Sequence, residues 1–89
     1  MLFPTYGHTP GHQSLKLKLD SGDIVLAADA CYFCRTLQER RLPVRVHDRE
    51  AMHRSLETLA RLQQGGARIF FGHDSEFWKT VPQAPTAIT

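Results

Sequence analysis

The segment SLKLKLDSGDIVLAAD, residues 14–29, carries the strongest secondary-structure signal in the sequence. Its first half alternates leucine with lysine, and this period of two predicts a strand with one buried face and one solvated face. The DSGD segment that follows predicts a turn, in which Gly22 supplies a backbone angle that other residues avoid. The apolar run IVLAA, residues 24–28, predicts a second, mostly buried strand. Two strands joined by a tight turn predict an antiparallel hairpin.

The chain after the hairpin predicts a loop, a helix and a third strand. Residues 31–47 have little periodicity and contain a proline, so we expect an irregular loop. Asp48 is a suitable N-cap for a helix that Gly65 ends. Apolar residues recur within it at helical spacing: Met52, Leu56, Leu59 and Leu62. ARIFF, residues 67–71, predicts a buried strand, which a crossover helix normally places parallel to the strand before it.

Size and composition fit one small α/β domain. The chain has 89 residues, which is near the lower limit for a self-sufficient core. We expect residues 1–80 to form the domain and residues 81–89, which carry two prolines, to be a flexible tail. A net charge of +2 is too small to argue for nucleic acid, and we expect the arginine-rich segment between Arg35 and Arg49 to be a solvated connection.

Targeting signals are lacking in the sequence as given. The start MLFPTYG is unlike a secretion signal, and the apolar runs are too short to span a membrane. Two cysteines do not make a disulfide framework. We therefore expect a protein of the reducing cytoplasm that has no membrane partner.

Three residues with metal-binding side chains are predicted to meet at one edge of the sheet. His8 precedes the first strand of the hairpin, Asp29 ends the second, and His73 ends the third strand. The strand topology brings these three points together, and strand ends are where α/β proteins usually build sites. Zinc, iron and manganese accept imidazole and carboxylate ligands. Taken singly, each residue is better explained as a turn, capping or backbone-pairing residue, and it is the combination of the three that favours a metal site.

Two further motifs offer other interpretations. His12 lies four residues after His8, but Pro10 and the neighbouring glycines argue against a helix that would pair them as ligands. We expect His12 to support the site or the loop instead. Cys31 and Cys34 form a C-x-x-C, which a redox centre or a structural zinc site also uses. The chain has no second cysteine pair, so this is the weaker alternative.

Three segments resemble a known family in the same order and with plausible spacing: GHTPGHQS at 7–14, VLAADACY at 25–32 and IFFGHD at 69–74. They resemble the C-terminal half of metallo-β-lactamase-fold hydrolases, and N-acyl-homoserine lactonases are the most similar family. The resemblance implies half of an αββα sandwich. It also implies that His8 binds one metal, that Asp29 bridges two, and that His73 binds the second. Tyr32 would lie over the metals and hold the lactone carbonyl or the leaving oxygen.

The resemblance covers only part of the family's site. The H-x-H-x-D-H motif is absent from this sequence, in which none of the five histidines forms H-x-H, and Tyr6 stands where the family usually has proline. The full family site implies two divalent metals, zinc first, with iron or manganese as alternatives. We therefore expect a fragment of a metal-dependent hydrolase that opens the ring of N-acyl-homoserine lactones, with an incomplete site.

The resemblance also implies partners and alternatives. Half a sandwich leaves a sheet face and an edge uncovered, so we expect this chain to need its missing N-terminal half or to self-associate. The substrate would be a small lactone or another ester. A non-catalytic remnant or an interaction fragment is the alternative, and the sequence leaves it open.

Overall fold

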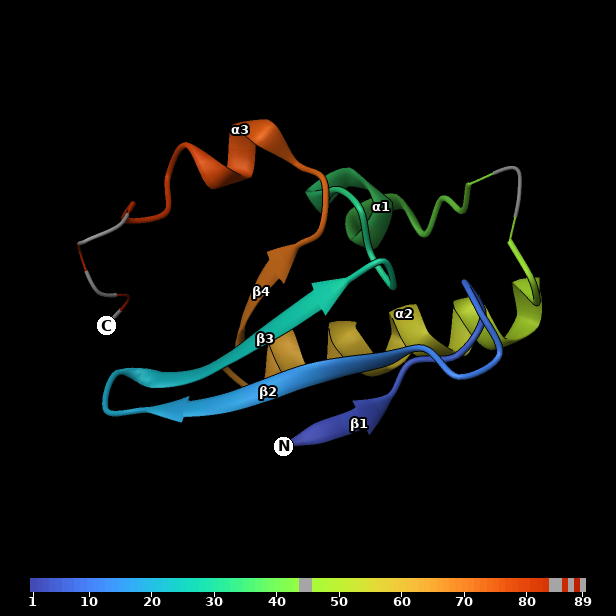
Figure 1. Ribbon diagram of the computed structural model, residues 1–89, viewed down its shortest axis with the longest axis horizontal. Coiled ribbons are helices and arrows are strands. Elements are labelled where there is room, and N and C mark those ends of the chain that lie inside the picture. The colour runs from blue at the N-terminus through green and yellow to red at the C-terminus, as the bar shows by residue number, and fades with distance from the viewer. Residues whose placement is uncertain (44–45, 84–85, 87, 89) are drawn as a thin grey trace.

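The computed structural model describes residues 1–43, 46–83, 86 and 88, so Arg45 of the arginine-rich segment and part of the expected tail lie outside the described residues. Four strands form one sheet in the order β1-β2-β3-β4 (Figure 1). The strands are β1 (Leu2–Pro4), β2 (Gln13–Leu19), β3 (Gly22–Ala28) and β4 (Arg68–Phe71). The helices are α1 (Cys34–Glu39), α2 (Arg49–Gln64) and α3 (Ser75–Trp78).

The strand pairing confirms the predicted hairpin and crossover. β2 and β3 are antiparallel, with Lys18 opposite Asp23 and Leu15 opposite Leu26. β3 and β4 are parallel, as a connection through a helix requires. The short strand β1, which pairs antiparallel with β2, was not predicted, because three residues are too few to show a period of two.

The predicted central helix is also confirmed. The Asp48 carboxylate accepts a hydrogen bond from the Ala51 amide at 3.0 Å, and Glu50 lies in the first turn, where the helix dipole favours an acidic side chain. The helix ends at Gln64, and the Gly65 amide donates to the Arg61 carbonyl. These caps define a 16-residue helix, the longest among the described residues.

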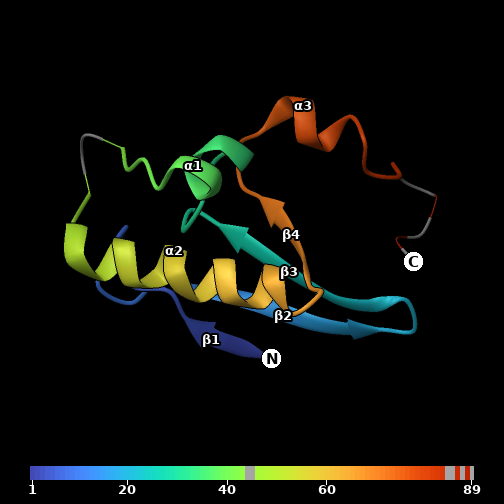
Figure 2. The same cartoon turned by 180° about the vertical axis from the view of Figure 1, so that it is seen from behind.

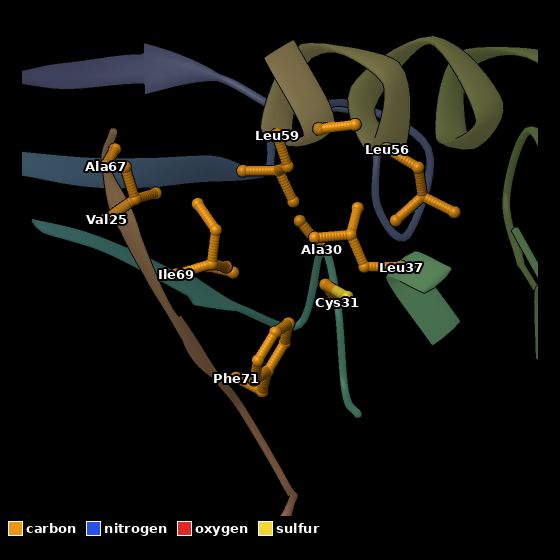
Figure 3. Close-up of a cluster of buried hydrophobic side chains, with 11 residues drawn as sticks. Val25, Ala30, Cys31, Leu37, Leu56, Leu59, Ala67, Ile69 and Phe71 are labelled. Carbon is orange, nitrogen blue, oxygen red and sulfur yellow. The ribbon is translucent and has the colours of Figure 1, made fainter. Parts of the chain in front are cut away.

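The two faces of the sheet are covered very differently. We call the side toward α2 the helix face; there Val25, Ile69 and Phe71 pack with Leu56 and Leu59 of the helix (Figure 3). α2 lies behind the sheet in Figure 1 and in front of it in Figure 2. We call the other side the leucine face; by strand register it carries the following leucines: Leu2, Leu15, Leu17, Leu19 and Leu26.

The burial of the hairpin leucines differs from the prediction. Leu15 and Leu19 are half-buried and Leu17 is 39% exposed, whereas Lys16 and Lys18 lie on the helix face. The alternation correctly indicated two different faces, but α2 covers the one that carries the lysines. Lys16 is accommodated there by an ion pair with Asp23 at 3.4 Å.

Two short helices lie outside the prediction. α1 occupies part of the segment expected to be an irregular loop, so that expectation is wrong for Cys34–Glu39. Only Leu37 of this helix is buried, and a single apolar anchor gives no helical periodicity. α3 is a single turn that Asp74 caps by accepting from the Phe77 amide. No helix in the described part of the chain has the length and apolar character that crossing a membrane requires.

Candidate metal centre

Asp29 leaves the end of β3 through an unusual backbone turn. Ala28 has φ 52°, a left-handed conformation that is uncommon for residues other than glycine. The ladder between β3 and β4 is irregular at the same point. This turn takes Asp29 out of the strand, so its side chain is 43% exposed rather than buried in the sheet. Backbone strain of this kind concentrates at functional sites.

His73 reaches Asp29 because Gly72 lets two backbones approach closely. A Cβ atom at Gly72 would lie 2.3 Å from the Ala28 carbonyl oxygen, so no other residue fits without movement. Backbone hydrogen bonds from Gly72 to Cys31 and from His73 to Tyr32, both 3.0 Å, join the two segments. The His73 Nε2 atom then lies 2.9 Å from Asp29 Oδ1.

His8 comes to the same carboxylate from a loop that is fixed to α2. Gly7 has φ +129°, and a Cβ atom there would lie 2.4 Å from the Met52 amide nitrogen. The Asp48 amide donates to the Gly7 carbonyl at 2.9 Å, and the hydroxyl of Ser55 donates to the Tyr6 carbonyl at 2.7 Å. The loop so held places His8 Nε2 3.4 Å from Asp29 Oδ2.

Tyr32 completes the cluster from the segment after Asp29. Its hydroxyl lies 3.5 Å from His8 Nδ1, and its ring meets that of His73 edge to face with centroids 4.5 Å apart. Partial burial, with the nearby Asp29 charge adding to it, raises the pKa of Tyr32 above its ordinary value. The phenol is therefore protonated at neutral pH and available as a hydrogen-bond donor.

The structure thus brings together all four predicted site residues from three segments: the loop before β2, the turn after β3 and the end of β4. The two imidazoles and one carboxylate suit a zinc ion in donor type. Among the described residues, however, no group of three or more His, Cys, Asp or Glu side chains is arranged to hold a metal ion. His8 and His73 each lie within contact distance of a different oxygen of Asp29, so these three residues fit a metal as part of a coordination shell and do not complete one.

Sequence reasoning missed the hydroxyls behind the His8 loop. Thr5 and Ser14 are buried, and they hydrogen-bond each other at 2.8 Å. Thr5 Oγ1 also lies 2.9 Å from His12 Nδ1. Burial, with the neighbouring His8 adding to it, lowers the pKa of His12 below its ordinary value. Thr5 lies just after β1 and Ser14 lies in β2, and threonine and serine at such positions are too common for the sequence to have singled them out.

The C-x-x-C alternative finds little support in the geometry. Cys31 and Cys34 are both free. Burial raises the pKa of the Cys31 thiol to about 12, so the reactive thiolate is scarce at neutral pH. The Cys34 amide donates to the Asp74 carboxylate at 2.9 Å, which ties the start of α1 to the end of β4. Both cysteines therefore contribute to the packing of the hydrophobic core.

Known proteins of similar sequence share this arrangement of strands and helices. No family model matches the chain. The N-acyl homoserine lactonase AttM of Azorhizobium caulinodans is 36% identical over 81 residues, covering 89% of this chain and 31% of the relative. The lactonase AiiA of Bacillus thuringiensis subsp. kurstaki is 35% identical over 89 residues, covering 98% of this chain and 35% of the relative.

Solved structures give the same result. An N-acyl homoserine lactone hydrolase with N-hexanoyl-L-homoserine at its catalytic metal centre has a TM-score of 0.86, covering 98% of this chain and 35% of that chain. AidC, a dizinc quorum-quenching lactonase, has a TM-score of 0.68 at 19% identity, which speaks for the fold alone. The fold is therefore that of the metallo-β-lactamase hydrolases, in their C-terminal part.

Within that class, the chain is homologous to the N-acyl homoserine lactonases and spans about a third of the length of the curated relatives it matches. The resemblance seen in the sequence is confirmed by these relatives. The residues of the missing H-x-H-x-D-H motif have no counterpart in this sequence.

Proposed function

We propose that this chain contributes part of a metal-dependent site that opens the lactone ring of N-acyl homoserine lactones. The observation that carries the proposal is the Asp29 carboxylate, which lies 3.4 Å from His8 and 2.9 Å from His73 at one edge of the sheet. Relatives that share this fold and are about a third identical over the aligned residues are lactonases, and one holds a lactone-derived product at a catalytic metal centre.

Each residue of the cluster has a distinct role in this proposal. His8 would bind one divalent ion and His73 the other, with zinc favoured and iron or manganese as alternatives. Asp29 offers one oxygen to each side and would join the two ions. Bound divalent metals lower the pKa of a coordinated water and polarise a carbonyl group. Tyr32 would hydrogen-bond the lactone carbonyl or the leaving oxygen through its hydroxyl and hold it there, as a preorganised donor does.

The remaining ligands must come from outside these residues. His8, Asp29 and His73 supply three protein ligands, too few to hold two ions firmly. We therefore infer that the chain alone binds zinc weakly and that full activity needs the part of the relatives that has no counterpart in this sequence. The two free cysteines suit the reducing cytoplasm, where we place the protein.

The partly exposed leucine face also favours a partner that covers this side of the sheet. Leu2 is 62% exposed and Leu17 39% exposed on a face whose other leucines are half-buried. Apolar area of this kind is typical of a surface that another chain segment covers. The missing N-terminal part, or a second copy of this chain, would bury it.

The test uses the purified chain and the N-terminal part of the Bacillus thuringiensis lactonase. Equilibrium dialysis measures bound zinc, and a pH-stat measures opening of N-hexanoyl-L-homoserine lactone. We expect weak zinc binding and no turnover by the chain alone, and both tighter zinc binding and turnover when the two parts are mixed. Asp29→Asn should abolish both gains. Asp20→Asn, in the exposed hairpin turn, is the matched control and should change neither.

The outcomes separate the proposal from its alternatives. Rapid turnover by the chain alone, with two tightly bound ions, would show that the site is complete without further ligands. No zinc binding in the mixture would favour a non-catalytic remnant, for which the absence of a converging group of three ligands among the described residues is the supporting observation. Sedimentation velocity of each sample shows whether a second copy covers the leucine face.

A further inference from the structure

A chain of buried hydroxyl groups runs behind the loop that carries His8. The Ser14 hydroxyl donates to the Ala27 carbonyl of β3 at 3.1 Å. Thr5 Oγ1 lies 2.8 Å from Ser14 Oγ and 2.9 Å from His12 Nδ1. Thr5 is 0% exposed and Ser14 2% exposed, so water does not compete for these groups. These hydrogen bonds therefore link the backbone of β3 to the imidazole of His12 in the loop.

Counting protons assigns a direction to each of these hydrogen bonds. A hydroxyl has one proton to donate. Ser14 gives its proton to the carbonyl of Ala27, so it can only accept from Thr5. Thr5 then has no proton left and must accept from His12. Nδ1 of His12 consequently carries a hydrogen, and in the neutral ring Nε2 is the acceptor; the tautomer follows from the network alone.

The ring fixed in this way lies against His8. The two imidazoles have centroids 5.9 Å apart and are nearly perpendicular, at 86°. The Thr5 amide also donates to the His12 carbonyl at 3.0 Å, so both the backbone and the side chain of His12 are anchored to the same residue. His8 is contacted from its other sides by Tyr32 and Asp29. The loop between Thr5 and His12 is thus closed at its base, with His8 at its tip.

We propose that His12 is a positioning residue. The hydrogen bonds that run from Ala27 through Ser14 and Thr5 hold it as the Nδ1–H tautomer, and its ring holds His8 in place against Asp29. The inference rests on the proposed function only for its effect on metal binding; the tautomer and the ring contacts do not depend on it. Partners that orient a metal-binding histidine typically change metal affinity by roughly 10- to 100-fold when they are removed.

The test is NMR spectroscopy of the ¹⁵N-labelled full chain without metal. Long-range ¹H–¹⁵N correlations report which ring nitrogen of each histidine carries the proton. We expect the Nδ1–H tautomer at His12 and nuclear Overhauser contacts from the His8 ring to the rings of His12 and Tyr32. A His12 ring protonated only at Nε2 would overturn the proposal without any variant.

Three substitutions separate positioning from general stability. Thr5→Val removes the hydroxyl, and we expect it to mix the His12 tautomers, weaken the His8 ring contacts and lower zinc affinity roughly 10- to 100-fold. Thr5→Ser keeps a hydroxyl and should restore all three. Thr80→Val removes a hydroxyl that donates to the Phe77 carbonyl, far from His12 in the sequence, and should change none of them.

Two results would contradict the proposal. One is a folded Thr5→Val protein with unchanged His12 tautomer and ring contacts; the other is a Thr5→Ser protein that resembles Thr5→Val. If neither the unsubstituted chain nor its mixture with the N-terminal part binds zinc, the proposed function fails, and the tautomer and the ring contacts still decide this inference.

Discussion

The helix face and the leucine face of the sheet belong to the same strands, yet they are buried to very different degrees. On the helix face, Val25 is fully buried and Ile69 and Phe71 are 3% exposed beneath a capped 16-residue helix. On the leucine face, the chain after β4 covers Ile24 and Phe70, and Leu17 remains 39% exposed. An apolar strand therefore indicates where a core can form, whereas the element packed against it determines whether that core is buried.

Truncating one leucine on each side gives the largest expected contrast. Leu59→Ala removes a fully buried side chain from the helix face, and such changes cost roughly 2–5 kcal/mol of unfolding free energy. Leu17→Ala removes an exposed side chain and should stay within about 1 kcal/mol, like most surface changes. Urea unfolding followed by circular dichroism measures both. Equal losses would mean that the leucine face is covered in solution.

A pair of glycine substitutions tests how tightly the His8 loop is held against α2. Gly7 and Gly22 have similar positive φ angles, but only Gly7 lies against the Met52 backbone. Both Gly7→Ala and Gly22→Ala should suffer backbone strain of roughly 1–3 kcal/mol. Gly7→Ala should lose about 1–3 kcal/mol more, because the new methyl group overpacks the contact. The same unfolding assay checks this, and equal values would contradict the close approach.

The N-cap of α2 contributes a smaller part of the stability of the helix face. Asp48→Ala removes the acceptor of the Ala51 amide, and loss of such a cap costs roughly 0.5–2 kcal/mol. Asp48→Ser keeps a capping oxygen and should retain most of the stability. Thermal unfolding of the two variants measures the difference. If the two variants were equally destabilised, capping would not explain the role of Asp48.

The smallest expected effect is a pH dependence at the junction of α1 and α2. Arg40 Nε donates to Glu57 at 2.7 Å, and this hydrogen bond lowers the pKa of the Glu57 carboxyl. A carboxyl whose pKa is lowered by folding stabilises the folded state above its ordinary pKa, and that stabilisation is lost as the pH falls through the lowered value. Glu57→Gln should therefore reduce stability slightly at pH 7, and this reduction should disappear as the pH falls through the lowered pKa. High salt should shrink the difference at pH 7, and a salt-independent loss would argue against charge as its cause.

The sequence predicted the elements that have strong local signals. The hairpin with its glycine turn, the helix with Asp48 at its start and Gly65 at its end, and the parallel third strand are all confirmed. α1 and β1 were missed because six and three residues give no periodicity. The side of the sheet that α2 covers depends on tertiary packing, which alternation alone does not report.

The site was predicted from topology, and its supporting contacts were not. Strand order brought His8, Asp29 and His73 to one edge, and the structure places them in contact. The left-handed turn at Ala28 and the close approach of the backbones at Gly72 orient these side chains. Both features depend on tertiary backbone geometry, which residue types alone do not predict. The buried hydroxyls of Thr5 and Ser14 are similarly ordinary in sequence.

The contact between His73 and Asp29 joins residues 44 positions apart, across a parallel pair of strands that only the completed crossover can close. Contacts of such long sequence separation form late, because the entropy of closing the intervening loop must be overcome first. Hairpin and helix can therefore appear early while this cluster is still unassembled. A reporter on the His73 ring would consequently time the closing of the crossover, and a nascent chain would have no ligand cluster until β4 had docked.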